Sequence, residues 1–338
     1  MIVQNMTYAI KDNQLVHISE VDSGLKCNCT CPACGEILIA RKGDKVIHHF
    51  AHKSTLECEY GYQTSLHMAA KQIIYDNQEI RVPDLYLDFP GVYKKELIEE
   101  ERNIKVIDVI LEKKLDNIIP DILLITDVGK IIVEIFVTHE IDSEKLEKIR
   151  CLDIPTIEIN LSSFERNITD DELKESLING IQNKSWIYHG KRAEIYNKFL
   201  NQAEYRKVIA RNHTLHVDNC PIQKRVWNGK PYANFLYDCD ECEFCISYTS
   251  VHKLEGSDDR SILCSGRNGI AHVKDFEIPL EKRIKDYEDK REDEMYELIG
   301  QGICPYCGNN LIIKNGKFGE FFGCSNYPHC RFTFSYNE

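Results

Sequence analysis

Four cysteines near the end of the chain have the spacing of a zinc ligand set. A Cys-Pro-Tyr-Cys pair is followed after sixteen residues by a third cysteine, and after five more by a fourth. Two thiolates separated by two residues bind one side of a tetrahedral ion, and a second pair completes the four ligands of structural zinc. The predicted ligands are Cys304, Cys307, Cys324 and Cys330. The pattern predicts one zinc ribbon within residues 301–338.

A second group of candidate zinc ligands lies near the start of the chain. A Cys-Pro-Ala-Cys pair is followed by a His-Phe-Ala-His pair. Two thiolates and two imidazoles are a common tetrahedral zinc set, which predicts a zinc-binding module over residues 1–60. The predicted ligands are Cys31, Cys34, His49 and His52. The alternative is that Cys29 or Cys58 replaces one of the histidines.

A third group of cysteines lies within residues 181–275, where five thiols compete for four places. We favour Cys220, Cys239, Cys242 and Cys264 as ligands, with Cys245 in place of Cys239 as the alternative. The three groups together predict three zinc ions per chain.

The remaining features of the cysteines and of the N-terminus bear on the cellular compartment. The chain has fifteen cysteines, an odd number, and residues 1–14 contain no apolar leader. No stretch approaches the ~20 apolar residues that a membrane helix needs. Reduced, metal-binding cysteines are therefore expected, in a cytoplasmic protein that does not contact a membrane.

Two carboxylates in the centre of the chain could bind a different metal. Asp121 and Glu134 lie on two apolar segments joined by Val128-Gly129. If these two residues form the hairpin loop, Leu123 faces Glu134, and Asp121 lies two residues along on the same face. A pair of carboxylates on one face can bind Mg²⁺ or Mn²⁺, which activates water and stabilises charge on a phosphate. The alternative is that Glu134 is an exposed strand residue and that Asp121 only follows a turn proline.

The elements that would position these carboxylates follow from periodicity. Residues 64–76 have apolar side chains at helical spacing, and 142–152 predict a second helix. Strands are predicted at 103–115, 118–127, 130–139 and 156–161. The order helix, three strands, helix, strand indicates an α/β core with a mixed sheet.

We divide the chain into five parts by composition. These are the zinc-binding module 1–60, the α/β core 61–180, the Cys-rich region 181–275, a charged helical linker 276–300 and the finger 301–338. The net charge is −12, with acidic residues dense in 95–175 and 281–297, whereas the finger is slightly basic. Such a charge distribution is compatible with weak, salt-sensitive DNA binding.

Several motifs within residues 20–162 resemble the CoiA-like competence family of the PD-(D/E)XK nuclease superfamily. They are CPACGE, HHFAH, SLHMAAK, PDI and VEIFVTHEIDSEK. The resemblance implies a restriction-endonuclease-like αβββαβ core and a metal-dependent nuclease acting on DNA, with Asp121 and Glu134 binding the catalytic metal.

The core also departs from that family pattern. Phe136 stands where a lysine is expected, and Thr64 stands where a glutamate often precedes the serine. Lys145 and His139 are the candidates to replace the missing lysine. His67 and Lys71 lie four residues apart on one helix face and could both address the same cleft, although we favour a structural role for His67.

The segment KFGEFFGCSNYPHCRFTF, within residues 302–334, resembles the C-terminal zinc finger of type IA topoisomerases. That resemblance implies DNA binding, with a preference for single strands. Aromatic residues interleaved with basic ones suit base stacking beside phosphate contacts, although some aromatics must pack the small core. The aromatic residues are Phe318, Phe321, Phe322, Tyr327 and Phe332, and the basic ones are Lys314, Lys317 and Arg331.

We interpret the chain as a DNA-binding, divalent-metal-dependent deoxyribonuclease with three structural zinc sites. The alternative, from a different class, is a catalytically inactive DNA-binding accessory protein that retains the nuclease fold. Phe136 is the residue that separates the two hypotheses. An RNA-directed nuclease is a third, weaker hypothesis, because stacking surfaces accept both polymers.

Overall fold

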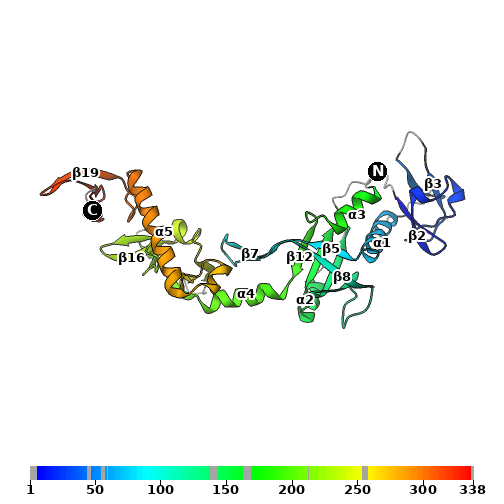
Figure 1. Ribbon diagram of the computed structural model, residues 1–338, viewed down its shortest axis with the longest axis horizontal. Helices are drawn as coiled ribbons and strands as arrows, with labels where there is room; N and C mark the ends of the chain where they lie inside the picture. The colour runs from blue at the N-terminus through cyan, green and yellow to red at the C-terminus, as the bar shows by residue number, and fades with distance from the viewer. Residues whose placement is uncertain are drawn as a thin grey trace. The chain divides into compact units, whose positions relative to one another are not determined.

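The structure is a computed structural model that describes residues 6–43, 47–54, 58, 60–137, 143–162, 169–211, 213–252 and 258–335. The chain divides into two compact units. The first contains Met1–Leu85 and Glu99–Gly190, and the second contains Tyr86–Ile98 and Lys191–Glu338. Each unit has its own sheet, as the ribbon in Figure 1 shows, and is described separately.

The first unit is built on a six-stranded sheet with the order β12-β11-β10-β9-β8-β5. Its strands are β5 (Glu79–Val82), β8 (Arg102–Leu111), β9 (Ile122–Thr126), β10 (Gly129–Phe136), β11 (Thr156–Asn160) and β12 (Lys184–Tyr188). β10 and β11 are parallel, and the other neighbours are antiparallel. The expected α/β core with a mixed sheet is confirmed.

Three helices accompany this sheet: α1 (Gly61–Tyr75), α2 (Ser143–Leu152) and α3 (Asp170–Ile178). The apolar stripe of α1 is buried at Leu66, Ala69, Ala70 and Ile74. The α2 helix connects the parallel strands β10 and β11, and its fully buried Ile149 packs with Leu123 and Ile132. The sheet face that carries these two residues is therefore covered by α2, close to the predicted carboxylates.

The register of the β9–β10 hairpin differs from the prediction. Thr126 pairs with Gly129, so that the loop residues are Asp127 and Val128, and Leu123 faces Ile132 instead of Glu134. The Thr126 hydroxyl donates to the Gly129 carbonyl (2.6 Å) and accepts from the Val128 amide (3.3 Å), which stabilises this loop. β9 also begins later than predicted, immediately after Pro120-Asp121.

The N-terminal part of the first unit has two short hairpins and its own core. They are formed by β1 (Tyr8–Lys11) with β2 (Gln14–His17), and by β3 (Leu38–Arg41) with β4 (His49–His52). Short 3-10 turns at Ile18–Glu20 and Leu25–Cys27 follow the first hairpin. Cys27 and Cys29 lie buried in this core beside Leu38 and Phe50. Cys29, one of the two alternative zinc ligands, and its neighbour Cys27 therefore pack in this core.

The second unit contains another six-stranded sheet, with the order β15-β16-β14-β13-β18-β17. Its strands are β13 (Glu204–Arg211), β14 (Thr214–Asp218), β15 (Arg225–Trp227), β16 (Lys230–Asn234), β17 (Cys245–His252) and β18 (Asp258–Cys264). The hairpin of β6 (Leu85–Asp88) and β7 (Lys95–Glu99) and the helix α4 (Gly190–Asn201) pack beside it. Short helical turns lie at Phe235–Cys239, Gly266–Asn268 and Val273–Glu277.

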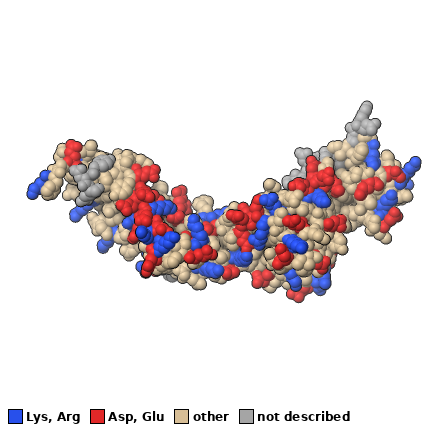
Figure 2. Space-filling model, viewed as in Figure 1, with Lys and Arg blue, Asp and Glu red and all other residues tan. Residues whose placement is uncertain are grey.

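The long helix α5 (Leu280–Gly300) leads to a three-stranded finger of β19 (Leu311–Gly316), β20 (Gly319–Cys324) and β21 (Thr333–Phe334). Acidic side chains gather over α5 in Figure 2, as its sequence requires. Tyr287 packs edge-on against Phe244, and Ile299 joins the core of the finger. The predicted charged helix therefore also packs against the modules on both sides. Among the described residues, no helix is both long and apolar enough to cross a bilayer.

Lys184 on β12 gives the first unit a testable pH dependence. Its side chain is buried, and Nζ donates to the carbonyls of Arg81 (2.7 Å) and Ile178 (3.3 Å). Burial, reinforced by the charge of Arg81, lowers the pKa of Lys184 to about 7. The unfolded chain, with a lysine pKa of about 10.4, binds more protons than the folded chain between these values. The free energy of unfolding should therefore rise as the pH increases across this window.

We expect Lys184→Met to remove this contribution, which is at most about 1.4 kcal/mol per pH unit. Urea unfolding followed by the fluorescence of Trp186, in a Trp227→Phe background, measures the effect near its source. The exposed Lys174→Met is the matched control and should keep the slope of the parent protein. Equal slopes in the parent and in Lys184→Met would show that Lys184 stays protonated when folded.

Candidate active site and zinc clusters

Asp121 and Glu134 lie across from each other at the end of the β9–β10 hairpin that is farthest from its loop. The pair Ile122–Val133 is the last in the ladder, and the two carboxylates follow it on either strand. The Ile135 amide donates to Asp121 Oδ2 (2.9 Å), which holds this side chain beside β10. Glu134 is only 3% exposed, within the apolar run of the strand. The predicted proximity of the two carboxylates is thus present despite the different register.

Two side chains of α1 contact Asp121. Lys71 Nζ lies 2.9 Å from Oδ1, and His67 Nε2 lies 3.0 Å from Oδ2. Burial alone raises the pKa of Asp121, but the hydrogen bond and charge of His67, the Ile135 amide and the charge of Lys71 together hold that pKa well below its usual range. Asp121 is therefore ionised at neutral pH. The four-residue spacing had indicated that His67 and Lys71 could address one cleft, and both contact Asp121, although a structural role had been favoured for His67.

Glu134 has a different environment. Its Oε2 accepts from Lys145 Nζ at 2.7 Å, and its Oε1 is buried without a hydrogen-bond partner among the described residues. Burial raises the pKa of Glu134 to about 7 against the lowering effect of Lys145, and both the charge of Asp121 and a side-chain hydrogen bond with it when Glu134 is protonated add to the rise. A buried carboxylate oxygen without a partner is costly, and a bound cation would remove that cost.

The structure adds a third carboxylate, Glu112, which the sequence did not indicate. Lys71 Nζ lies 2.7 Å from Glu112 Oε1 as well as 2.9 Å from Asp121, so that one ammonium bridges two carboxylates. The backbone brings them together, because the Glu112 amide donates to the Asp121 carbonyl (3.1 Å). Glu112 follows β8 in a charged loop, and nothing in its local pattern distinguishes it from its neighbours.

The candidate ligands for a divalent cation in this site are carboxylate oxygens, although both oxygens of Asp121 already contact His67, Lys71 or the Ile135 amide. Carboxylate oxygens are the ligands that Mg²⁺ and Mn²⁺ prefer, and the unpartnered Oε1 of Glu134 provides one beside Asp121. Lys145, from α2, contacts Glu134, and Phe136 stands where the resemblance led us to expect a lysine. His139, the other predicted replacement, lies outside the described residues.

The N-terminal cluster contains Cys31, Cys34, His52 and Cys58, whose ligand atoms all lie within 4.8 Å of one another. His49, the fourth predicted ligand, is not among them; its Nδ1 contacts the Ile47 carbonyl at 2.8 Å instead. His49 and His52 are three residues apart on a β-strand, so their side chains point to opposite faces. The structure therefore supports the alternative in which Cys58 replaces a histidine.

The C-terminal cluster is the predicted one. The sulfur atoms of Cys304, Cys307, Cys324 and Cys330 lie within 4.8 Å of one another. Cys304 and Cys330 are 3.7 Å apart, and Cys307 and Cys324 are 3.3 Å apart. The Asn326 amide also points to the Cys324 sulfur (3.4 Å), as backbone amides do toward thiolates. The two ends of the chain thus carry cysteine clusters of the zinc-binding type.

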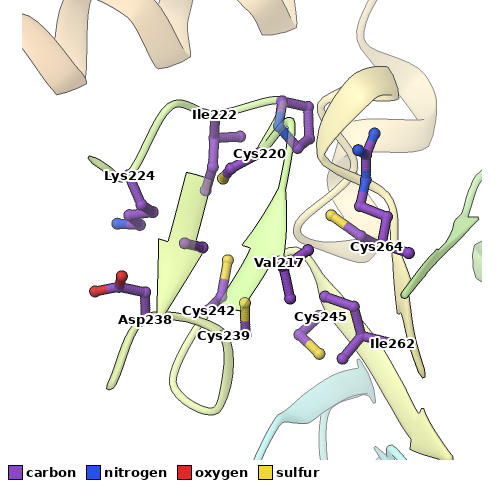
Figure 3. A pocket seen from close by; sticks show the side chains of 13 residues that line it. Val217, Cys220, Ile222, Lys224, Asp238, Cys239, Cys242, Cys245, Ile262 and Cys264 are labelled. Carbon is purple, nitrogen blue, oxygen red and sulfur yellow. The ribbon is translucent and has the colours of Figure 1, made fainter. Parts of the chain in front are cut away.

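The five cysteines of the middle region line one cavity, but their sulfur atoms are not close enough together to form a metal cluster of the kind found at the two ends of the chain. Cys220, Cys239, Cys242, Cys245 and Cys264 line a single cavity of about 20 Å³, shown in Figure 3. Among the described residues, however, no three of their sulfur atoms lie mutually within the 4.8 Å found in the other clusters. The structure therefore brings all five candidates together without selecting four of them.

Both ends of the chain match known families. Residues 14–61 match the profile of the competence protein CoiA, N-terminal domain, and residues 301–338 match that of the topoisomerase DNA binding C4 zinc finger. The chain carries a CoiA-type segment and a topoisomerase-type finger. No solved structure matches it significantly.

Two curated relatives are topoisomerases that share only a short segment with this chain. DNA topoisomerase 1 of Methanothermobacter thermautotrophicus is 47% identical over 49 residues, which are 14% of this chain and 6% of that protein. DNA topoisomerase 1 of Methanocaldococcus jannaschii is 57% identical over 74 residues, 21% of this chain and 9% of that protein. The chain therefore covers less than a tenth of either relative.

Proposed function

We propose that the chain binds DNA through its C-terminal finger and hydrolyses DNA with a divalent metal at Asp121 and Glu134. The observation that carries the nuclease proposal is the buried Glu134, whose Oε1 has no partner in the described part of the chain and which lies beside the ionised Asp121. A buried, unpartnered carboxylate oxygen is retained at a cost in stability, and metal binding is a physical reason to retain it.

Each residue of the site would have a separate task. Asp121 and Glu134 would hold the cation, and Lys145 would orient water or phosphate from its place 2.7 Å from Glu134. Lys71, held between Asp121 and Glu112, would fix the Asp121 carboxylate and add positive charge. The bound metal would supply an activated water and stabilise the charge on the phosphate.

The order of the elements supports placing this core in the PD-(D/E)XK superfamily. In the first unit, α1 is followed by the edge strand β5, by β8, β9 and β10, and then by α2 and β11. Apart from the additional edge strand β5, this is the αβββαβ order of the expected restriction-endonuclease-like fold. Asp121 precedes the second of these strands, and Glu134 lies in the third. Lys145, from α2, places an ammonium group beside the Glu134 carboxylate. Phe136, at the position where the family has a lysine, has no charge to provide.

The second candidate function is a DNA-binding accessory protein without catalysis. Lys71 and Lys145 pair with Asp121 and Glu134, respectively. Such internal ion pairs can compensate much of the carboxylate charge without a metal. This hypothesis differs from the first in one measurable respect, which is cleavage.

The test is incubation of the full-length protein with end-labelled single- and double-stranded DNA, with Mg²⁺, with Mn²⁺ and without divalent metal. We expect cleavage that requires one of these ions. Binding without cleavage under all conditions would support the accessory function. Faster cleavage of RNA of the same sequence would reassign the substrate.

We also propose three zinc ions per chain, one for each cysteine group, and expect metal analysis of protein purified without chelator to give a value near three. The N-terminal ligands can be resolved by comparing Cys58→Ser with His49→Ala. Cys58 lies within the 4.8 Å cluster and His49 does not, so only Cys58→Ser should lower the zinc content by about one per chain. A loss in His49→Ala alone would restore the first ligand set.

A further inference from the structure

Two clefts lie on either side of the β15–β16 hairpin in the second unit. The larger, of about 690 Å³, is lined by residues that include Arg211, His216, Trp227 and Tyr232. The smaller, of about 620 Å³, is lined by residues that include Val226, Tyr306 and Arg331. Asn228 and Pro231 line both clefts, so the two meet at the hairpin. Each cleft has the volume of a small-ligand site, large enough for a nucleotide.

The finger is attached directly to this hairpin. The Val226 amide donates to the Tyr306 carbonyl (3.2 Å). The Trp227 indole stacks on the imidazole of His329, with ring centroids 5.6 Å apart and planes inclined by 14°. The tip of β15 and the finger therefore form one surface, on which Trp227 is still 42% exposed.

Two basic side chains on this surface have no acidic partner among the described residues, whereas two arginines do. Arg211 is paired with Asp218, and Arg225 with Asp238. Lys230 and Arg331 are both exposed, and neither has an ion pair with any residue that the structure describes. One borders the larger cleft and the other the smaller, on the two sides of the hairpin.

The finger itself presents further aromatic rings beside lysines. Phe318 is 94% exposed with Lys317 Nζ 5.8 Å from its ring centre, and Tyr327 is 64% exposed with Lys314 Nζ 5.0 Å from its ring centre. Exposed aromatic faces next to ammonium groups bind unpaired bases and their phosphates, whereas the bases of a duplex are stacked internally. Their chemistry favours a single strand.

We propose that a single DNA strand crosses the β15–β16 hairpin, so that the Cys-rich region (residues 181–275) and the finger both bind it. Trp227 and Tyr232 provide stacking faces in the larger cleft, and Tyr306 provides one in the smaller. Lys230 and Arg331 contact phosphates on the two sides. This inference rests on the DNA-binding part of the proposed function and is independent of cleavage.

The test uses the full-length protein and an oligothymidylate strand without added divalent metal. Trp186→Phe leaves Trp227 as the only tryptophan, because the chain has two. We expect the strand to quench Trp227 fluorescence at saturation. Trp227→Ala should weaken binding roughly tenfold, the size expected for losing one base–aromatic stack. Tyr205→Ala, at a more exposed aromatic of β13 that lines neither cleft, is the control and should bind as the parent does.

A second variant tests the same surface without changing its aromatic packing. Lys230→Ala with Arg331→Ala should reduce the slope of log K against log salt by about 1.4, because each phosphate contact on a single strand contributes ~0.7. Normal zinc content in this variant and in Trp227→Ala would show that the finger is still folded.

The possible outcomes separate this inference from the proposed function. If the parent protein binds neither single- nor double-stranded DNA, DNA binding fails as a whole. If it binds DNA but Trp227 is not quenched and both variants bind as the parent does, only the shared surface is overturned. Preference for a duplex or for oligouridylate would overturn the assignment of a single DNA strand as the occupant.

Discussion

Glu134→Gln and Asp121→Asn are each expected to lower metal-dependent DNA cleavage by several orders of magnitude while zinc content and DNA affinity stay unchanged. Both carboxylates would hold the catalytic cation, and an amide is a neutral, weaker ligand for a hard ion. Neither side chain belongs to either zinc cluster or to the hairpin clefts. The measurements are single-turnover cleavage of a labelled strand, metal analysis and fluorescence anisotropy.

The size of the effect should follow the role of each residue. Lys145→Ala removes a group that touches Glu134 without holding the metal, so its loss of rate should be smaller than that of either carboxylate variant. Asp127→Asn makes the same carboxylate-to-amide change at the exposed loop of this hairpin. It is the matched control and should leave the cleavage rate unchanged. Full activity in Glu134→Gln would remove the nuclease site from this hairpin.

The two carboxylates were predicted to be neighbours although the predicted hairpin register was wrong. The observed loop is displaced by one residue toward the N-terminus, which shifts the pairing by two residues. Because side chains alternate with a period of two, such a shift keeps every residue on its original face. Asp121 and Glu134 therefore stayed together. The deciding contact was the Thr126 hydroxyl bonded to Gly129, which a pattern of apolar residues does not encode.

Contacts between residues from distant segments of the chain were the hardest to predict from the sequence. Lys71 could be placed near the cleft by its spacing from His67, but its bridge to Glu112 depends on how β8 ends. In the N-terminal module, strand alternation already opposed a site that uses both His49 and His52, since three residues separate them. In the middle region, the four favoured thiols and the alternative Cys245 all line one cavity, so the structure does not select among them.

The sequence predicted which helices and strands follow one another better than it predicted the residues at which they begin and end. Strand 156–161 and helix 142–152 agree with β11 and α2 within a residue at each end, because their apolar periods are regular. The predicted strand 118–127 begins only at Ile122, since Pro120 has no amide to donate to a neighbouring strand. The predicted strand 103–115 ends at Leu111, where the charged loop containing Glu112 begins.

Cys330→Ser is expected to remove one zinc ion per chain and to unfold the finger. The core of the finger is small and consists largely of its ligands, with Leu311 and Phe332 as the main apolar residues and Ile299 contributed by α5. Structural zinc contributes about 10–16 kcal/mol to the folding of such modules, more than a core of this size can supply. Loss of one thiolate therefore removes most of what stabilises β19–β21.

Unfolding of the finger would also separate His329 from Trp227 and remove the basic and aromatic side chains from the DNA surface. We therefore expect the affinity for single-stranded DNA to fall at least roughly tenfold, with an accompanying change in Trp227 fluorescence. Cys151→Ser, at an exposed cysteine outside the clusters, is the control and should change neither. Unchanged affinity in Cys330→Ser, with one zinc lost, would show that DNA is bound elsewhere on the chain. The Asp121–Glu134 site lies in the other unit and has its own core, so its cleavage at saturating DNA should persist.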